Sequence, residues 1–321
     1  MTGASGFIGR HVVAEALRRG HFVSAMVRPA TPIRELPWAD QERVTLVRLD
    51  LRSERHLTEV LLGIETVVHL AVAGWRETVV TTENLLRAMD AAKCTSLVLV
   101  SSFAVYDYDR VPPFGLLDET SPLERRPERR DAYCHAKLVQ EELAREWGTE
   151  RGRCLCVLRP GSVIGGNDAW TPRVGIQMTS KWWIRIGAWA RLPLSYVENC
   201  AEAIVHCAEH RMARGETFNI VDDDLPTQRR YSRRLQKLTR PQPHILPLPW
   251  PLLLLTAWLA VLANRALLRG RGRLPQLLRP PSLSARCKPL RYTNRKLREK
   301  LDWRPRFTLE EALGRIYRTD E

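Results

Sequence analysis

The sequence lacks the cysteine spacing of a metal site or a disulfide framework. Its seven cysteines include no CxxC pair and no Cys/His cluster with the spacing of metal ligands. Cys154 and Cys156 alternate along an apolar run, so we expect both to be buried on one face of a strand. We therefore expect no metal site and a reducing, cytoplasmic compartment.

The N-terminal stretch does not resemble a secretion signal, and the sequence shows no internal repeats. Arg10 and His11 interrupt the first apolar stretch, so we expect no signal peptide. The chain has 321 residues, of which 44% are hydrophobic and 27% are charged. This is enough to bury a large core, which excludes disorder as the default interpretation.

Acidic residues are scarce only in the C-terminal third. Residues 225–321 hold 22 Lys and Arg but 6 Asp and Glu, whereas the first 224 residues hold 28 basic and 30 acidic groups. Such a basic surface could meet nucleic acid, anionic lipid headgroups or a phosphorylated substrate, or it could simply be solvated. We expect no nucleic-acid partner, and we keep peripheral contact with an anionic membrane as an alternative.

Apolar β-branched runs alternate with amphipathic segments in the first half, which predicts βαβ units and a parallel sheet. Strands are expected at 22–27, 44–49, 66–70, 96–100 and 154–158, and helices at 9–19, 53–62, 82–92 and 132–147. We predict an α/β, Rossmann-type doubly wound fold over residues 1–160. Residues 161–321 are expected to form mainly a smaller substrate-binding subdomain, with Ser195–Glu209 packing back on the first domain.

A hydrophobic strand before the glycine-rich loop is missing, because only Met1 and Thr2 precede Gly3. Such a strand lies centrally in the sheet, and its loss would leave neighbouring backbone groups unpaired. We therefore expect a truncated first strand and a true translation start roughly five to ten residues upstream.

The first glycines form a phosphate-binding loop at the start of a helix. Glycines at every third position allow a tight turn and a close approach of the backbone to a pyrophosphate, and the helix N-terminus offers free N–H groups. The block TGASGFIG resembles the cofactor loop of extended short-chain dehydrogenases/reductases, the NAD-dependent epimerase/dehydratase family. The residues expected to hold the cofactor are Gly3, Ser5, Gly6, Phe7, Ile8 and Gly9.

The second strand ends in Arg28, where NAD-binding proteins usually carry an acidic residue for the ribose 2′-hydroxyl. A guanidinium group can instead bind a 2′-phosphate through two hydrogen bonds. We therefore favour NADP over NAD as the cofactor. The alternative is that Arg28 is a solvated residue at the strand end.

Tyr133 and Lys137 are four residues apart and share one face of a predicted helix. Hydride transfer at a carbinol or carbonyl needs a proton donor and acceptor that works near neutral pH. A neighbouring cation must therefore lower the pKa of the tyrosine, and Lys137 can supply that charge.

The resemblance to the family implies further site residues. Ser102, in a block similar to S-S-x-x-V-Y, would bond the substrate oxygen and complete the catalytic set with Tyr133 and Lys137. Ser101 ends the strand and, with Tyr133 and Lys137, would also contact the cofactor. Asp50 and Leu51 match a pair that contacts the adenine. Two further segments match the turn under the cofactor and the stretch along the nicotinamide: Leu70, Ala71 and Ala73, and Pro160, Gly161, Ser162 and Val163.

Two departures from the family pattern narrow the chemistry. Phe103 and Ala104 stand where the dehydratase branch carries an Asp-Glu pair, which counts against elimination of water. Thr78 stands where relatives carry an asparagine, so any proton relay through that position must run differently here.

The segment Leu252–Ala263 is an uncharged apolar run that follows three prolines. A helix over these twelve residues would rise about 18 Å, too short for a bilayer core of about 30 Å. Trp250, Trp258 and the following Arg265 and Arg269 would suit an interfacial helix at an anionic membrane. A helix that covers the substrate pocket or packs on a second subunit, in a homodimer common for the family, is the alternative.

Three functions remain open. The first is an epimerase or oxidoreductase of a nucleotide sugar, whose diphosphate the C-terminal arginines would bind. The second is an oxidoreductase of a hydrophobic alcohol or ketone, similar to 3β-hydroxysteroid dehydrogenases or dihydroflavonol reductases. The third is a non-catalytic dinucleotide sensor, against which the intact Ser102, Tyr133 and Lys137 weigh.

Overall fold

A parallel sheet with the order β11-β6-β4-β3 forms the centre of the computed structural model, which describes residues 1–53, 56–166, 169–269, 271–272, 274–275 and 278–318. The four strands are β3 (Val67–His69), β4 (Ser96–Val100), β6 (Cys154–Pro160) and β11 (Thr217–Ile220). β4 and β6 lie in the middle, and the fourth strand is contributed by the second half of the chain.

The position between β3 and β1 (Val23–Val27) is held by the first residues of the chain. Thr2 forms parallel bridges with both Met26 and His69, and the amide of Met26 donates to the carbonyl of Met1 over 2.9 Å. β2 (Val44–Arg48) pairs with β1 on the outer side. Two residues therefore do the pairing expected of a central strand.

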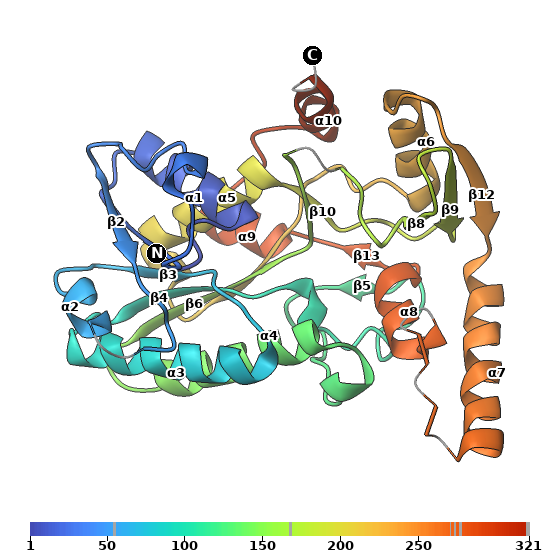
Figure 1. Ribbon diagram of the computed structural model, residues 1–321, viewed down its shortest axis with the longest axis horizontal. Coiled ribbons are helices and arrows are strands. Elements are labelled where there is room, and N and C mark those ends of the chain that lie inside the picture. Colours follow the sequence, from blue (N-terminus) through green and yellow to red (C-terminus); the bar gives the residue numbers. More distant parts are fainter. Residues whose placement is uncertain (54–55, 167–168, 270, 273, 276–277, 319–321) are drawn as a thin grey trace.

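Helices cover both faces of this sheet (Figure 1), so the predicted doubly wound fold is confirmed. On one face lie α1 (Phe7–Arg18) and α5 (Val197–Glu209), which pack on each other; on the other lie α2 (Leu57–Leu61), α3 (Trp75–Ala91) and α4 (Ala132–Gly148). α3 begins seven residues before its predicted start at Thr82, and α2 is shorter than the predicted 53–62, of which residues 54–55 lie outside the described part.

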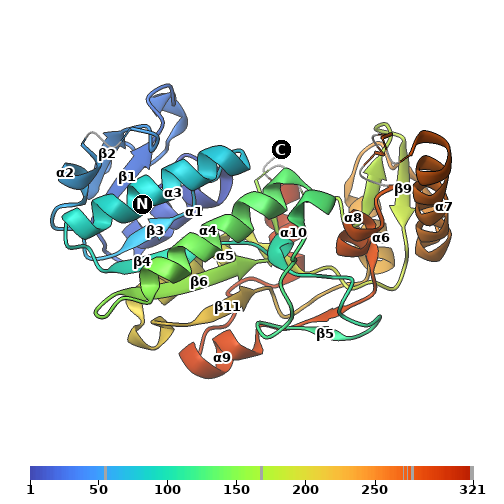
Figure 2. The ribbon, with the colours of Figure 1, turned by 90° about the horizontal axis from the view of Figure 1, so that it is seen from below.

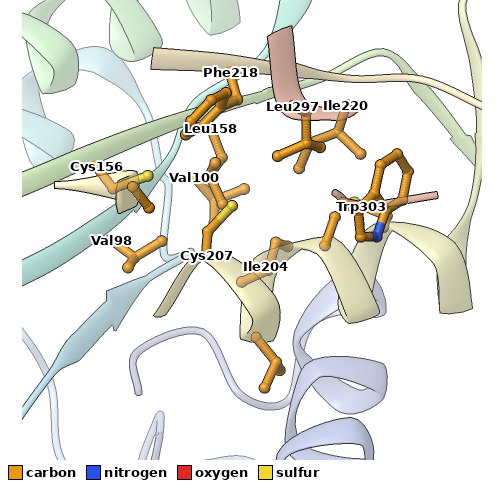
Figure 3. Packing of buried hydrophobic residues seen from close by; sticks show 14 of the residues in the cluster. Val98, Val100, Cys156, Leu158, Ile204, Cys207, Phe218, Ile220, Leu297 and Trp303 are labelled. Carbon is orange, nitrogen blue, oxygen red and sulfur yellow. The ribbon is translucent and has the colours of Figure 1, made fainter. Parts of the chain in front are cut away.

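The strand residues are apolar on both faces because both faces are covered. Val98 and Val100 point to the α5 side, where Ile204 and Phe218 join them (Figure 3), and the alternate residues Leu97 and Leu99 point to the α3 side. The α5 cluster also includes Leu297 of α9 (Arg295–Leu301) and Trp303. Cys156 belongs to the same cluster, and all seven cysteines are free.

A second region lies beyond the carboxyl ends of the central strands (Figure 2). Its sheet has the order β12-β9-β8 and carries helices on both sides. Its elements are β8 (Gly175–Gln177), β9 (Trp182–Ile186), α6 (Gln228–Leu238), β12 (His244–Leu248), α7 (Trp250–Leu268) and α8 (Pro280–Cys287). Shorter elements complete the fold: η1 (Ile33–Glu35), η2 (Phe103–Val105), β5 (Leu116–Leu117), η3 (Pro127–Arg129), β7 (Ser162–Ile164), β10 (Leu194–Tyr196), η4 (Arg211–Ala213), β13 (Arg291–Tyr292) and α10 (Leu309–Arg318).

Helix α7 is longer than the sequence indicates. Pro251 fits the first turn, where a helix needs no N–H from it, and the helix then continues through Asn264 and Arg265 to end before Arg269 in the left-handed region. Its 19 residues rise about 28 Å. The expectation that this segment is too short to cross a bilayer is therefore wrong: by length and composition, Trp250–Leu267 could cross a membrane.

Candidate active site

The glycine loop is built so that side chains would not fit. Gly3 has a φ of +69°, and a Cβ there would lie 2.9 Å from the amide nitrogen of Ala71. A Cβ on Gly9 would lie 2.1 Å from the carbonyl oxygen of Gly3, so the helix can approach the loop only without it. Gly6 precedes α1 without a side-chain cap, which leaves the first N–H groups of the helix open to an anion.

The remaining loop residues lie beside this helix start. Phe7 is 45% exposed and faces the turn at Gly165 and Gly166, while Ile8 and Ser5 are partly buried. The tight turn, the open N–H groups and the lack of a carboxylate in the loop suit the pyrophosphate of a dinucleotide.

The turn after β3 comes directly against the loop, as the family pattern implies for Leu70, Ala71 and Ala73. The amide of Ala71 donates to the Thr2 hydroxyl over 3.4 Å. The departure at Thr78 has a structural role here: its buried hydroxyl accepts from the amide of Ala73 over 3.1 Å and donates to the carbonyl of that residue over 3.2 Å. Thr78 therefore ties α3 to this turn.

Two arginines surround Asp50 at the expected adenine end of the site. Asp50 is paired with Arg52, whose guanidinium nitrogen lies 2.6 Å from the carboxylate, and this hydrogen bond lowers the pKa of Asp50. The exposed Arg28 contributes a further positive charge near the same carboxylate. Leu51 is buried in the core on the α3 side, and its carbonyl oxygen accepts a hydrogen bond from the Asn84 side chain over 3.0 Å.

Ser102 and Tyr133 meet at the carboxyl end of β4. Ser102 follows the strand and accepts a hydrogen bond from the amide of Ala104. This hydrogen bond caps the start of η2. Tyr133 lies in the first turn of α4, which Asp131 caps by accepting from the amide of Cys134 over 2.8 Å. The Ser102 side chain lies close enough to the Tyr133 hydroxyl to act on its pKa, and Tyr133 is 46% exposed. The structure thus brings together two of the three predicted catalytic residues.

Arg130 holds these two segments in place, a role that nothing in the sequence pattern indicates. Its guanidinium group is buried and donates to the carbonyl oxygens of Ala104 and Tyr106 over 2.8 and 2.9 Å. Because Arg130 directly precedes the capping residue of α4, it fixes the loop of Ser102 against the helix of Tyr133.

Lys137 lies one turn beyond Tyr133 and is fully buried. Its ammonium group donates to the carbonyl oxygen of Val100 over 2.7 Å and to the side-chain oxygen of Gln140 over 2.8 Å. Gln140 then contacts Nε2 of His69 over 2.9 Å, and Nδ1 of His69 lies 2.6 Å from the Thr2 hydroxyl. A buried chain of polar contacts therefore joins the catalytic lysine to the glycine loop.

The orientation of this chain follows from its donors. An ammonium group can only donate, so the Gln140 oxygen faces Lys137 and its NH2 group faces His69. Nε2 of His69 must then accept, which places the ring proton on Nδ1. Burial and the charge of Lys137 lower the pKa of His69 to about 3, so the imidazole is neutral and stays in this tautomer.

The pKa of Tyr133 does not follow the expected direction. Burial of its hydroxyl raises the pKa of Tyr133 and outweighs the lowering effect of the Ser102 side chain. The ammonium group of Lys137 is directed at Val100 and Gln140. Burial also lowers the pKa of Lys137 to about 7. The prediction that the charge of Lys137 acts on the tyrosine during catalysis stays a prediction.

The segment after β6 lies close to a buried ion pair. Arg159 binds Glu141 of α4 through two hydrogen bonds of 2.6 and 2.9 Å, and burial of both groups isolates the pair from solvent. Gly161 is required because a Cβ would lie 2.2 Å from the carbonyl oxygen of Pro193. The neighbouring predicted residues are a buried Pro160 and the partly buried Ser162 and Val163 of β7.

The predicted positions Ser101, Phe103 and Ala104 lie just after β4. Ser101 is buried, and its amide donates to the carbonyl of Leu158 over 2.7 Å. Phe103 and Ala104 lie in η2, with Phe103 buried against Tyr106 and Tyr292.

Among the described residues, no group of three or more His, Cys, Asp or Glu side chains could hold a metal ion.

Comparison with known proteins identifies the family of this chain. The profile of the NAD dependent epimerase/dehydratase family matches residues 1–221. The chain belongs to this family. The predicted resemblance to extended short-chain dehydrogenases/reductases is therefore confirmed, as is the prediction of a family of dinucleotide-dependent enzymes.

Curated relatives include reductases and dehydrogenases. Cinnamoyl-CoA reductase 1 of Petunia hybrida is 33% identical over 180 residues, which cover 51% of this chain and 54% of that protein. The chain thus matches about half the length of the cinnamoyl-CoA reductases. The 3 beta-hydroxysteroid dehydrogenase/Delta 5→4-isomerase of Mycobacterium tuberculosis strain H37Rv is 24% identical, and the match covers 98% of this chain and 87% of that protein.

Solved structures share the fold over the whole chain. UDP-glucose 4-epimerase of Thermotoga maritima with UDP-glucose has a TM-score of 0.71 at 19% identity and covers 100% of this chain and 98% of its own. A short-chain dehydrogenase/reductase superfamily protein from Agrobacterium tumefaciens with bound NAD also has a TM-score of 0.71, at 18% identity, and covers 99% and 95%.

Proposed function

We propose that the protein is an NADP-dependent oxidoreductase that interconverts a lipophilic secondary alcohol and its ketone. The observation that carries this proposal is the position of the Tyr133 hydroxyl beside the Ser102 side chain, with Lys137 one turn away on the same helix. A bound nicotinamide supplies a hydride to the carbonyl carbon or accepts one from the carbinol carbon. Tyr133 donates the proton to the carbonyl oxygen in reduction and removes it from the hydroxyl group in oxidation. Ser102 donates a hydrogen bond to the same oxygen as negative charge develops on it.

NADP is supported by the charges at the adenine end. Asp50 is already paired with Arg52, so its carboxylate is a poor acceptor for a free ribose 2′-hydroxyl. Arg28 is exposed at the end of β1, where a 2′-phosphate could bind between it and Arg52. Each such charged hydrogen bond contributes about 1.5–3 kcal/mol.

A lipophilic substrate is supported by the apolar helix α7, which packs on α8 next to the site. α8 contacts the segment that precedes the catalytic helix: the Ser282 hydroxyl and the Arg279 guanidinium group each lie 3.5 Å from the carbonyl oxygen of Arg130. α7, which packs on α8, carries no charge before Arg265. The relative matched along 98% of the chain is by its name a 3 beta-hydroxysteroid dehydrogenase.

A nucleotide sugar, the substrate class that the sequence places first, stays a second candidate because the C-terminal third is rich in arginine. One assay distinguishes the candidates. Purified protein is first titrated with NADPH and NADH by fluorescence, and cofactor turnover is then measured with steroid ketones and alcohols and with UDP-sugars. Net oxidation of NADPH with a steroid ketone is the expected result. Conversion of a UDP-sugar without net cofactor turnover would identify an epimerase, and cofactor binding without any turnover would identify a sensor.

A further inference from the structure

Helix α7 has an inner face that packs on the protein. Ala257 is buried, and Trp250, Leu253 and Leu254 are partly buried beside it, at the i, i+3, i+4, i+7 spacing of one helical face. This inner face covers β9, β12 and α8, with contacts that include Ile184, Ile186, Leu248, Leu283 and Cys287.

The opposite face of α7 is apolar and exposed. Its side chains are each 51–56% exposed, and they are Leu252, Leu255, Trp258, Leu259 and Leu262. We call these five residues the outer stripe. Figures 1 and 2 both show α7 at the outer edge of the molecule, so no described element covers the outer stripe. A contiguous exposed apolar face of this kind marks an interaction surface.

Charge identifies the kind of partner. The 74 residues from Leu225 to Arg298, which include α6, α7 and α8, contain 17 Lys and Arg and no Asp or Glu. Arg265, Arg269 and Arg271 are exposed and follow the outer stripe directly. A surface of leucines and tryptophan flanked by arginines is complementary to an anionic lipid headgroup layer over an acyl region.

A second group of arginines lies on β9 and α6, beside the strand that leads into α7. Arg185 of β9 and Arg229 and Arg233 of α6 line a hollow of about 380 Å³ together with Ile245 and Pro247 of β12. Their mutual repulsion, after burial, lowers the pKa of Arg185. Three guanidinium groups that share one hollow favour a bound anion, as a lipid phosphate would provide.

We propose that the outer stripe of α7 docks the protein on an anionic lipid bilayer, with the helix lying in the plane of the interface. The in-plane orientation follows from the fold: the inner face stays bound to the small sheet, and the chain returns to α8, which is held at Arg130. A helix that crossed the bilayer would have to give up these contacts. A second copy of the chain is a poorer occupant, because residues 225–298 offer no carboxylate to pair with the arginines that would be brought together.

This docking goes beyond the proposed function and does not depend on it. It places α8, and with it the segment before Tyr133, next to the lipid phase. A water-soluble substrate would leave the docking unaffected.

The test is co-sedimentation of the full-length protein with vesicles of phosphatidylcholine alone or with phosphatidylglycerol added. We expect binding to the anionic vesicles, weaker binding at high salt, and little binding to phosphatidylcholine alone. The double variant Leu255→Glu/Leu259→Glu should bind the anionic vesicles at least tenfold more weakly. The matched control is Leu62→Glu/Met212→Glu, which makes the same charge change at exposed apolar positions elsewhere and should bind like the wild type.

Two further measurements separate docking from its alternatives. NADPH titration checks that both double variants are folded, and sedimentation velocity without lipid measures the oligomeric state. Equal vesicle binding by wild type and Leu255→Glu/Leu259→Glu would overturn the proposal. The proposal would also be overturned if the wild type were a dimer that bound no vesicles, and if only Leu255→Glu/Leu259→Glu dissociated this dimer. Resistance of the bound protein to alkaline carbonate would show a spanning helix and would contradict the in-plane orientation.

Discussion

Gln140 accepts a hydrogen bond from the buried ammonium group of Lys137 over 2.8 Å and contacts His69 with its other end. The side chain thus joins the catalytic lysine to the turn under the glycine loop. Because the pKa of Lys137 is lowered to about 7 by burial, this acceptor helps to decide whether the lysine is charged at neutral pH.

Replacement of Gln140 should therefore move the alkaline limb of the pH profile. The charged lysine is present below its pKa and is lost as the pH rises through it. Gln140→Leu removes an acceptor that stabilises the charged form, so the alkaline limb of kcat/KM should shift down by about one to two pH units. Gln140→Glu should shift it up. The control Gln236→Leu, in α6, should leave the limb in place; an unmoved limb in both Gln140 variants would show that Gln140 only packs.

Arg28 should determine the cofactor preference. Arg28→Asp replaces a donor for a 2′-phosphate by a carboxylate, which repels the phosphate and can accept from a ribose hydroxyl. We expect the ratio of kcat/KM for NADPH to that for NADH to fall by about tenfold to a hundredfold. Arg211→Asp, an exposed charge reversal on η4, is the control. An unchanged ratio in Arg28→Asp would mean that another residue reads the 2′ position.

The buried pair of Arg159 and Glu141 should contribute to stability only while both partners are present. Burial opposes ionisation of Glu141, but its hydrogen bond to Arg159 outweighs this and lowers its pKa. Arg159→Met should reduce the free energy of unfolding in urea by about 3–5 kcal/mol, and Arg159→Met/Glu141→Met should recover most of the loss.

The control for this pair is Arg145, an exposed residue that lies 3.3 Å from the same carboxylate. Arg145→Met should cost less than about 1 kcal/mol, because an exposed ion pair is screened by solvent. Since the folded-state pKa of Glu141 is lowered, its contribution is present above the ordinary pKa of a glutamate and is lost as the pH falls below it. Equal losses for Arg145→Met and Arg159→Met would contradict this role of burial.

The central sheet could be predicted from the sequence because its residues are apolar on both faces. Runs such as Ser96–Val100 and Cys154–Pro160 are continuous, and each lies between helices with a clear 3.6-residue period. The glycine loop could also be predicted from the sequence. Its conformation leaves no room for a Cβ at Gly3 and Gly9, so these positions must be glycine and the spacing is visible in the sequence. The bounds of α7 are harder to predict from the sequence, because Pro251 is compatible with its first turn and Asn264 does not end it.

The contacts that position the catalytic residues could not be predicted in the same way. Arg130 binds backbone oxygens at Ala104 and Tyr106, more than 20 positions earlier, and a lone arginine before a helix cap carries no pattern. His69 and Gln140 are 71 positions apart. Only the packing of α4 on the sheet brings such residues together. Thr78 departs from the family pattern in the sequence, but only the structure shows its hydrogen bonds to Ala73.

The most direct test of the proposed chemistry is the turnover of Tyr133→Phe with NADPH and the lipophilic ketone that the wild type reduces. Phenylalanine keeps the exposed ring but removes the proton donor, so NADPH affinity should stay within about twofold while kcat falls by about 10² to 10⁴. The fluorescence titration and the rate of NADPH oxidation are measured on the same preparation. Retention of wild-type turnover with unchanged NADPH affinity would contradict the assignment of Tyr133 as the general acid.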